Sequence, residues 1–365
     1  MAGIKKAFFA KIFKSSITII TLILVIQSVL SAQDKTEQIR AYLEQVRLTT
    51  GAPALSAAVA VDYRIVFSGG VGYADIENKV PATGKTVYRV ASISKPIGAI
   101  GLMQLLEQGR VALDDPIQNY VPSFPQKQDT ITLEHLLTHT SGIRHYNSGE
   151  FGAMVHYESL ADAIGIFKDD PLRFAPGTDY SYSTYGFNLV QGVIETASEM
   201  DILNYMRRFV WEPAGMLSTY FEMPGEIVYN RAQGYTRTEG QIRNARYTDV
   251  SIKYIGGGII STVEDLVRVF IALDNGVLMK PESVELMYTE HYNLRPNSGR
   301  ALGWSVDTDS SGRRRISHSG GATGFGSMLI NYPDQKVIVA VISNQDFSSV
   351  GRVAQNIAQA YLIPH

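Results

Sequence analysis

The chain has 365 residues, of which 45% are apolar and 19% are charged, so its composition is that of a globular protein and excludes a disordered one. It contains no cysteine, which excludes a disulfide and a lipoprotein anchor. The formal net charge is −2, and residues 1–32 carry four lysines and no acid, so the remaining chain is near −6. Such a surface is a poor partner for nucleic acid, which attracts basic patches.

The first 32 residues have the layout of a secretory signal peptide. A basic opening precedes an apolar run at 17–26, and small residues follow at Ser28, Ser31 and Ala32. The run is short for a membrane span, which needs about 20 apolar residues, and the segment lacks the arginines of a mitochondrial transit peptide. We therefore expect cleavage after Ala32 and a periplasmic or extracellular protein. An N-terminal membrane anchor that stays uncleaved is the alternative.

Hydrophobic periodicity then predicts the elements of the fold in chain order. A helix is expected at 34–49, where Ile39, Leu43 and Val46 recur at spacings of four and three. Strands at 54–61 and 64–71 are separated by only two residues, which predicts a tight hairpin. Further helices are expected at 92–108, 133–137, 188–197, 262–274 and 350–362, and further strands at 315–318, 324–332 and 336–343.

Strands near both ends of the chain, with helices between them, indicate an α/β (α+β) fold. We expect residues 33–365 to form one domain, in which an antiparallel sheet from both termini is flanked by the terminal helices. A helical lobe is inserted at about 109–254. The helix at 92–108 has little polar surface, so it is expected to be buried in the middle of the protein.

Ser92 and Lys95 are the first candidates for chemistry, because residues three apart on a helix share a face. A serine is a weak nucleophile until a neighbouring base takes its proton. A lysine is such a base only when its pKa falls from about 10.4 toward neutrality, and burial lowers it in that direction. Alone, the pair is a weak signal, because a helix cap followed by a surface lysine gives the same pattern.

Two further candidates lie far along the chain. Tyr182, on a predicted loop, can relay protons if a cation such as Lys95 lowers its pKa. His318 ends a predicted strand and precedes a glycine-rich stretch, where a strand-edge amide can donate to an oxyanion. Taken singly, each residue is equally well explained by a structural role, Tyr182 as a packing tyrosine and His318 as a structural histidine.

The sequence favours neither a metal nor a cofactor. His135 and His139 are four apart, as in a zinc site on a helix, but the glutamate of a metalloprotease is absent between them. Both histidines are therefore expected to be structural or near the rim of the site. The glycine-rich stretch 320–326 has no lysine in the register of a phosphate-binding loop.

Taken together, these motifs resemble the serine beta-lactamase-related family, which includes class C beta-lactamases, penicillin-binding proteins, D-alanyl-D-alanine carboxypeptidases and related esterases. The resemblance covers about residues 39–360. The segments that carry it are YRVASISKP at 88–96, ITLEHLLTHTSGI at 131–143, PGTDYSYSTYGFNLV at 176–190, GGGIISTVEDL at 256–266 and HSGGATGF at 318–325.

The resemblance implies a role for each motif residue. Ser92 would be acylated, and Lys95 would activate it. Tyr182 would act as general acid or base toward the leaving group and the deacylating water, and His318 would stand where the family has a triad lysine. The backbone amides of Ser92 and Gly321 would form the oxyanion hole. The expected substrate contacts are Thr184, Ser319 and Gly320.

Two departures from the family pattern bear on the substrate. Many members have lysine in place of His318 and asparagine in place of Thr184. A histidine is mostly neutral at pH 7, so it holds a substrate carboxylate less strongly than a lysine does. The resemblance is therefore stronger to mitochondrial serine beta-lactamase-like proteins and to bacterial esterases and peptidases than to efficient beta-lactamases.

We expect hydrolysis of an ester or amide in a small molecule or peptide, such as one derived from peptidoglycan, without a metal or cofactor. A beta-lactamase or a D-alanyl-D-alanine carboxypeptidase is the alternative within the same chemistry. The alternative of another class is a non-catalytic relative that binds peptidoglycan or protein, or that forms filaments. Ser92, Lys95 and Tyr182 are all present, which favours an enzyme. The sequence does not indicate an oligomeric state.

Overall fold

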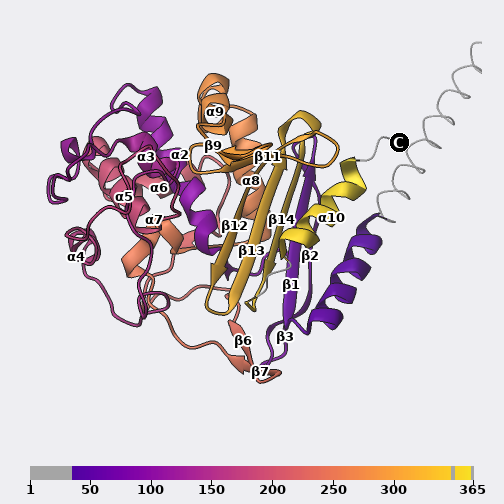
Figure 1. The fold of residues 1–365 in the computed structure, drawn as a ribbon. Helices are drawn as coiled ribbons and strands as arrows, with labels where there is room; N and C mark the ends of the chain where they lie inside the picture. The colour runs from indigo at the N-terminus through magenta and orange to yellow at the C-terminus, as the bar shows by residue number, and fades with distance from the viewer. Residues whose placement is uncertain (1–34, 347–349, 363–365) are drawn as a thin grey trace, which may run out of the picture.

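The computed structural model describes residues 35–346 and 350–362, so the predicted signal peptide at 1–32 lies outside the described residues. A nine-stranded antiparallel sheet forms its centre, in the order β3-β2-β1-β14-β13-β12-β11-β10-β9 (Figure 1). The strands are β1 Ala54–Val61, β2 Arg64–Asp75, β3 Val80–Pro81, β9 Tyr292–Arg295, β10 Ser298–Arg300, β11 Ser305–Thr308, β12 Arg314–Ala322, β13 Phe325–Tyr332 and β14 Val337–Ser343.

The two ends of the chain meet in the middle of this sheet. Strand β1 pairs with β14 from Leu55↔Ser343 to Val61↔Val337. On its other side β1 forms a hairpin with β2, and both turn residues, Asp62 and Tyr63, have a positive φ. Such a two-residue turn matches the twist of the flanking strands. The prediction of a sheet built from both termini is confirmed.

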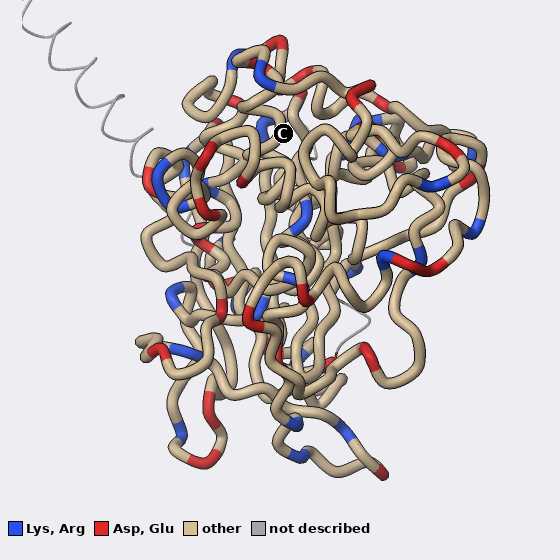
Figure 2. The backbone as a smooth tube through the Cα atoms, turned by 90° about the vertical axis from the view of Figure 1, so that its left-hand side faces the viewer, with Lys and Arg blue, Asp and Glu red and all other residues tan. Residues whose placement is uncertain are grey.

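Helices cover both faces of the sheet because its central strands are apolar on both sides. On one face, residues such as Val59 and Val339 pack with the helix at 35–50 and with α10 Val350–Leu362. On the other face, residues such as Ala58 and Ala340 pack in the main core, where α2 Ser94–Glu107 and α8 Val263–Asp274 lie. Charged residues of both signs are spread over the outer parts of the molecule (Figure 2).

The segment predicted as a helical lobe is only partly helical. Beyond its helices, residues 109–254 contain β5 Tyr220–Phe221, which pairs with β8 Ile259–Ser261, and a separate hairpin of β6 Tyr235–Thr238 and β7 Gln241–Asn244. The division of the chain into domains stays a prediction. The helices here are α3 Leu133–Leu137, α4 Leu160–Gly165, α5 Tyr185–Ser198, α6 Ile202–Met206, the π-helical η3 Arg207–Trp211 and the 3-10 turns η2 Ile117–Asn119 and η4 Ser251–Lys253.

The remaining elements complete the frame around the site. Strand β4 Tyr88–Arg89 pairs with β8, and the 3-10 turn η1 Ala91–Ile93 leads directly into α2. The others are α7 Tyr254–Gly257, α9 Pro281–Tyr288 and the turn η5 Pro333–Gln335. Among the described residues, no helix combines the length and apolar character that a membrane crossing requires.

Candidate active site

Ser92 lies in the turn η1, two residues before the start of α2, so the helix predicted from 92 begins slightly later. Ala91 is held at φ 50°, a conformation that costs a non-glycine residue of order 1 kcal/mol. The surrounding structure fixes this turn. Ser94 Oγ donates to the Ala91 carbonyl over 2.6 Å, and Ser327 Oγ on β13 donates to the Val90 carbonyl over 2.8 Å.

Lys95, on the first turn of α2, is hydrogen-bonded to this serine. Its Nζ lies 3.2 Å from Ser92 Oγ and donates to the carbonyl of Gly256. The side chain is fully buried, at 0% exposure. Burial therefore holds the pKa of Lys95 well below its usual value, and the charge of Lys253 lowers it further. A neutral amine beside a serine hydroxyl can accept its proton.

Tyr182 completes a three-residue contact with Ser92 and Lys95. A hydrogen bond joins the side chains of Tyr182 and Ser92, and Lys95 Nζ lies 4.9 Å from the centre of the tyrosine ring. The sequence left open whether a cation lowers the pKa of this phenol. The charge of Arg300 does lower it, but burial is the larger effect and raises the pKa of Tyr182. Tyr182 is therefore a neutral proton donor in the resting site.

Two histidines hold the loop that carries Tyr182. The backbone amide of Ser183 donates to His139 Nδ1, and that of Thr184 donates to His145 Nδ1, each over 3.2 Å. The His139 ring also lies 4.3 Å from the Tyr182 ring. Burial lowers the pKa of both histidines, to about 4 for His145, so both accept these bonds as neutral rings. His139 was predicted to be structural or near the site rim, and it supports Tyr182 directly.

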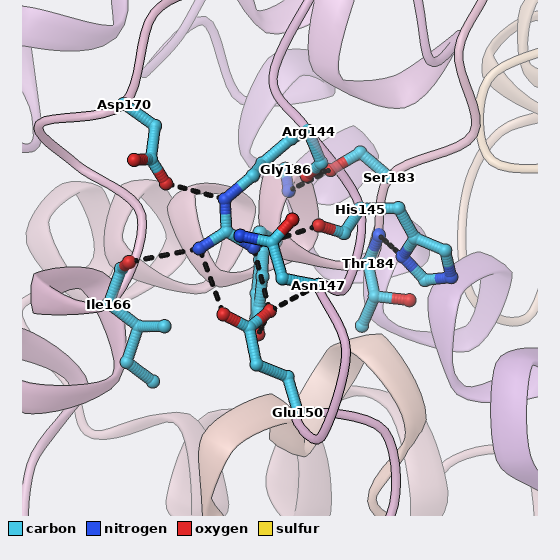
Figure 3. A network of polar contacts seen from close by, with 10 residues as sticks. Arg144, His145, Asn147, Glu150, Ile166, Asp170, Ser183, Thr184 and Gly186 are labelled. Carbon is cyan, nitrogen blue, oxygen red and sulfur yellow. Dashed lines mark hydrogen bonds and ion pairs between the residues drawn. The ribbon is translucent and has the colours of Figure 1, made fainter.

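Arg144 supports the same loop through a network of polar contacts (Figure 3). Its guanidinium donates to Glu150 over 2.7 Å and to Asp170 over 2.5 Å. Ser183 Oγ donates to the Arg144 carbonyl over 2.8 Å, and Tyr185 donates from its hydroxyl to Glu150. The Tyr182 loop therefore rests on a partly buried ion-pair network that no short sequence motif revealed.

His318 and the glycines after it form the opposite wall. His318, on β12, is 6% exposed and donates from Nδ1 to the Ser319 carbonyl over 2.7 Å. Burial lowers its pKa to about 3, with a further contribution from the charge of Lys95, so the ring is neutral. Its ring centre lies 6.3 Å from that of Tyr182. The structure therefore places His318 at the site, without a positive charge.

The glycines of this strand have separate reasons to be glycine. A Cβ on Gly320 would lie 2.2 Å from the carbonyl oxygen of Val90, so only glycine lets β12 pass this close to the Ser92 turn. A Cβ on Gly321 would meet nothing within 4 Å. A cavity of about 550 Å³ lies at this strand edge, and its lining includes Phe151, Ser319, Gly320 and Gly321. Ser319 and Gly320 thus line this cavity, and their predicted contact with substrate stays a prediction.

Thr184 is placed differently from these wall residues. Its side chain is 2% exposed, and a hydrogen bond joins it to the side chain of Tyr146. Its predicted contact with substrate stays a prediction. The predicted absence of a zinc site likewise stays a prediction. Across residues 35–346 and 350–362, no three His, Cys, Asp or Glu side chains are grouped to hold a metal ion.

A family model described as Beta-lactamase matches residues 36–362. The chain belongs to the beta-lactamase family. The mitochondrial serine beta-lactamase-like protein LACTB of Homo sapiens is 29% identical, over 88% of this chain and 79% of the human protein. The octameric penicillin-binding protein homologue from Pyrococcus abyssi has a TM-score of 0.80 at 23% identity, over 89% of this chain and 77% of that chain. D-amino acid amidase from Ochrobactrum anthropi SV3, complexed with D-phenylalanine, has a TM-score of 0.79 at 20% identity, over 90% and 99%.

These similarities identify the fold as the beta-lactamase and penicillin-binding-protein fold, as the sequence predicted. They do not test the roles assigned to single residues. Two cations beside the site of this family member, Lys253 and Arg300, were not predicted from the sequence. Lys253 lies three residues before Gly256, where a segment that resembles the family begins, so its position offered a signal. Arg300, on β10, belongs to no motif and had none.

Because this beta-lactamase-family protein has buried histidines, we expect its free energy of unfolding to fall on acidification. In an unfolded chain a histidine has a pKa of about 6.5, whereas those of His145 and His318 are lowered to about 4 and about 3. Below pH 6.5 the unfolded state therefore binds more protons, and each such histidine removes up to about 1.4 kcal/mol of unfolding free energy per pH unit. Urea unfolding at pH 7, 6 and 5 measures this slope.

The His318→Gln variant is the control for this slope, because glutamine does not titrate. Its unfolding free energy is expected to depend less steeply on pH than that of the wild type, whatever its absolute value. Equal slopes in the two proteins between pH 7 and 5 would show that folding does not lower the pKa of His318.

Proposed function

We propose that this protein is a serine hydrolase that forms an acyl-enzyme on Ser92 and hydrolyses an ester or amide. The observation that carries the proposal is the contact between Ser92 and Lys95. A fully buried amine lies 3.2 Å from the hydroxyl, and no carboxylate forms an ion pair with it among the described residues. A buried amine without a counter-ion is neutral, and a neutral amine is a base.

The proposed reaction follows from the protonation states of the site. Ser92 Oγ attacks the substrate carbonyl carbon as its proton passes to the neutral Nζ of Lys95. The backbone amides of Ser92 and Gly321 hold the oxyanion, and loss of one such donor typically costs about 3 kcal/mol of transition-state stabilisation. The C–O or C–N bond then breaks as the neutral phenol of Tyr182 protonates the leaving group.

Deacylation repeats these steps with water as the nucleophile. The tyrosinate left after the first step takes a proton from the attacking water, and Ser92 Oγ recovers its proton from the Lys95 ammonium as the acid leaves. Each residue then returns to its starting protonation state. No metal or cofactor takes part in this sequence.

The wall opposite Ser92 supports esters and peptides over beta-lactams as substrates. His318 stands where many family members have a lysine, and its lowered pKa keeps it neutral. The fold is shared with a D-amino acid amidase and with penicillin-binding proteins, which places amide substrates and D-amino-acid peptides first in a screen. The predicted export of the chain remains part of this proposal.

Labelling with a fluorophosphonate, read by intact mass, tests the proposal. We expect one label per chain in the wild type and none in Ser92→Ala, because only an activated serine reacts at an appreciable rate. Ser123→Ala is the control, since Ser123 is an exposed serine outside the site and its loss should leave the labelling unchanged. Absence of a label on the folded wild type would overturn the proposal and favour a non-catalytic binding protein or filament-forming relative.

A further inference from the structure

A second cavity, of about 680 Å³, lies apart from the candidate active site, where α6 and η3 meet the segment around β5. Among the described residues, none lines both this cavity and the one beside Gly320 and Gly321. Cavities that hold small molecules have volumes of about 300–1,000 Å³ and mostly apolar walls. We call this space the Trp211 cavity, after the tryptophan in its wall.

The lining of the Trp211 cavity combines buried and exposed apolar side chains. The buried ones, each at most 5% exposed, are Val87, Trp211, Met216 and Phe221. The exposed ones are Leu203, Leu217, Tyr220, Ile227 and Tyr229. Ile227 is 83% exposed and Tyr229 is 84% exposed. Apolar side chains that gather in water around one cavity indicate a binding site, because a ligand that covers them is bound favourably.

The charges of this lining favour an uncharged ligand. Its charged residues are Arg207, Glu212 and Glu226. Arg207 Nε lies 3.9 Å from Glu212 Oε1, so the cation is already compensated. The described lining therefore offers no free cation to a carboxylate or phosphate, and the exposed Glu226 attracts a cation only weakly because water screens it. Ser218 and Asn230 supply neutral hydrogen-bonding groups for a hydroxyl or carbonyl.

One wall of the Trp211 cavity leads directly to the proposed nucleophile. Val87 lies one residue before β4 and five residues before Ser92. Its amide donates to the Asn230 carbonyl, and its carbonyl accepts from the Ala232 amide, each over 2.9 Å. The exposed segment at 226–230 is therefore bonded to the strand that carries the Ser92 turn.

A second wall reaches the same turn through β5 and β8. Phe221 on β5 pairs with Ile259 on β8, and the Ile259 amide donates to Ser94 Oγ over 3.1 Å. The Ser94 hydroxyl in turn holds the η1 turn. Glu222, next to Phe221, forms an ion pair of 2.6 Å with Arg89 at the end of β4. A change in the packing of the cavity wall is therefore transmitted to the Ser92 turn by direct contacts.

We propose that the Trp211 cavity binds an uncharged molecule with an apolar body and a hydroxyl or carbonyl head, and that this ligand raises the reactivity of Ser92. The binding does not depend on the proposed hydrolase function, whereas the regulation rests on it. A bound ligand packs against Val87 and Phe221 and covers the segment at 226–230. It thereby favours the arrangement in which Ser92 lies beside Lys95.

Three probes with one chain length and different heads test the ligand class: 1-decanol, decanoate and decyltrimethylammonium. Tryptophan emission reports binding, because Trp211 lines the cavity, whereas Trp304, the other tryptophan of the chain, is packed 4.5 Å from the Phe270 ring. Decanol is expected to change the emission in a saturable way. The two charged probes should bind at least about tenfold more weakly, because their heads lose water without gaining a counter-ion. Equal affinity for either charged probe would overturn the assignment.

A variant of the rim locates the binding site. Leu217→Asp and Ile227→Asp, combined in one protein, place two carboxylates at the cavity, and both positions are exposed enough for the fold to tolerate them. The affinity for decanol should fall about tenfold or more. Leu48→Asp, at a leucine that is 65% exposed on the helix at 35–50, is the matched control and should bind decanol like the wild type. Unchanged affinity in the double variant, or an equal loss in the control, contradicts the site.

Two measurements test the regulation. Saturating decanol is expected to raise the rate of fluorophosphonate labelling of the wild type about 3- to 10-fold, and to leave that of the double variant unchanged. Hydrogen exchange of the segment 85–94, read by mass spectrometry, should slow on addition of decanol, also in Ser92→Ala. An unchanged labelling rate or unchanged exchange at saturation overturns the regulation. Slowed exchange in a wild type that is never labelled contradicts only the hydrolase function.

Discussion

Replacing Lys95 with methionine is expected to slow the acylation of Ser92 by about 10³-fold. Methionine fills the buried space of the lysine stem but has no amine to take the serine proton. The variant should remain folded, because it removes a buried amine that is costly to desolvate, against the loss of one bond to the Gly256 carbonyl. The second-order rate of fluorophosphonate labelling measures the effect directly.

The pH dependence of labelling distinguishes a general base from a packing residue. In the wild type the rate should rise with pH and level off once Lys95 is neutral, at a pH well below the usual pKa of lysine, because burial lowers the pKa of Lys95. In the Lys95→Met variant the labelling rate should not show this rise with pH. Lys85→Met, at an exposed position, should label like the wild type. Rapid labelling of a folded Lys95→Met protein would assign the base to another group.

Replacing Arg144 with methionine is expected to destabilise the protein by about 3 kcal/mol. The change leaves Glu150 and Asp170 without their shared cation, and leaving these partly buried carboxylates uncompensated adds to the loss of the attraction itself. We place the value at the lower end of the range for buried pairs because the Asp170 side chain is 41% exposed. Urea unfolding at pH 7 measures it.

Two further variants serve as comparisons for the stability of Arg144→Met. Arg207→Met removes the pair with Glu212, whose side chains are 64% and 61% exposed, and should change stability by less than about 0.5 kcal/mol. The Glu150→Gln variant should lose less unfolding free energy than Arg144→Met, because the substitution removes a carboxylate charge instead of leaving it without its cation. An Arg144→Met protein as stable as the wild type would mean that the network contributes nothing net to folding.

The main features of the fold were predictable because they depend on local patterns. The hairpin at 54–71 and the strands at 324–332 and 336–343 are rich in apolar residues and bounded by turn residues, and the predicted bounds agree with the structure to within a few residues. The edge strands β9, β10 and β11 were not predicted. They are three or four residues long and partly exposed, so they carry too few apolar residues to show a period.

The candidate site was predictable where its residues lie in short motifs. Ser92 and Lys95 are three positions apart, so helical geometry alone places them together. His145, Arg144 and Arg300 reach the site through tertiary packing, and no spacing in the sequence encodes those contacts. The protonation of Tyr182 could not be predicted from the sequence, because it depends on the loss of water around its ring on packing, which outweighs the charge of Arg300.

The pairing of β1 with β14 also sets the order in which the protein can fold. Leu55 pairs with Ser343, so the centre of the sheet cannot close until β14 has been synthesised, almost 300 residues after β1. Contacts between such distant segments are slow to form. Until then the apolar strand β1 has one open edge, which is a template for wrong pairing between chains. Newly made protein should therefore need protection from aggregation, and a truncation before β14 should leave the N-terminal hairpin without a partner.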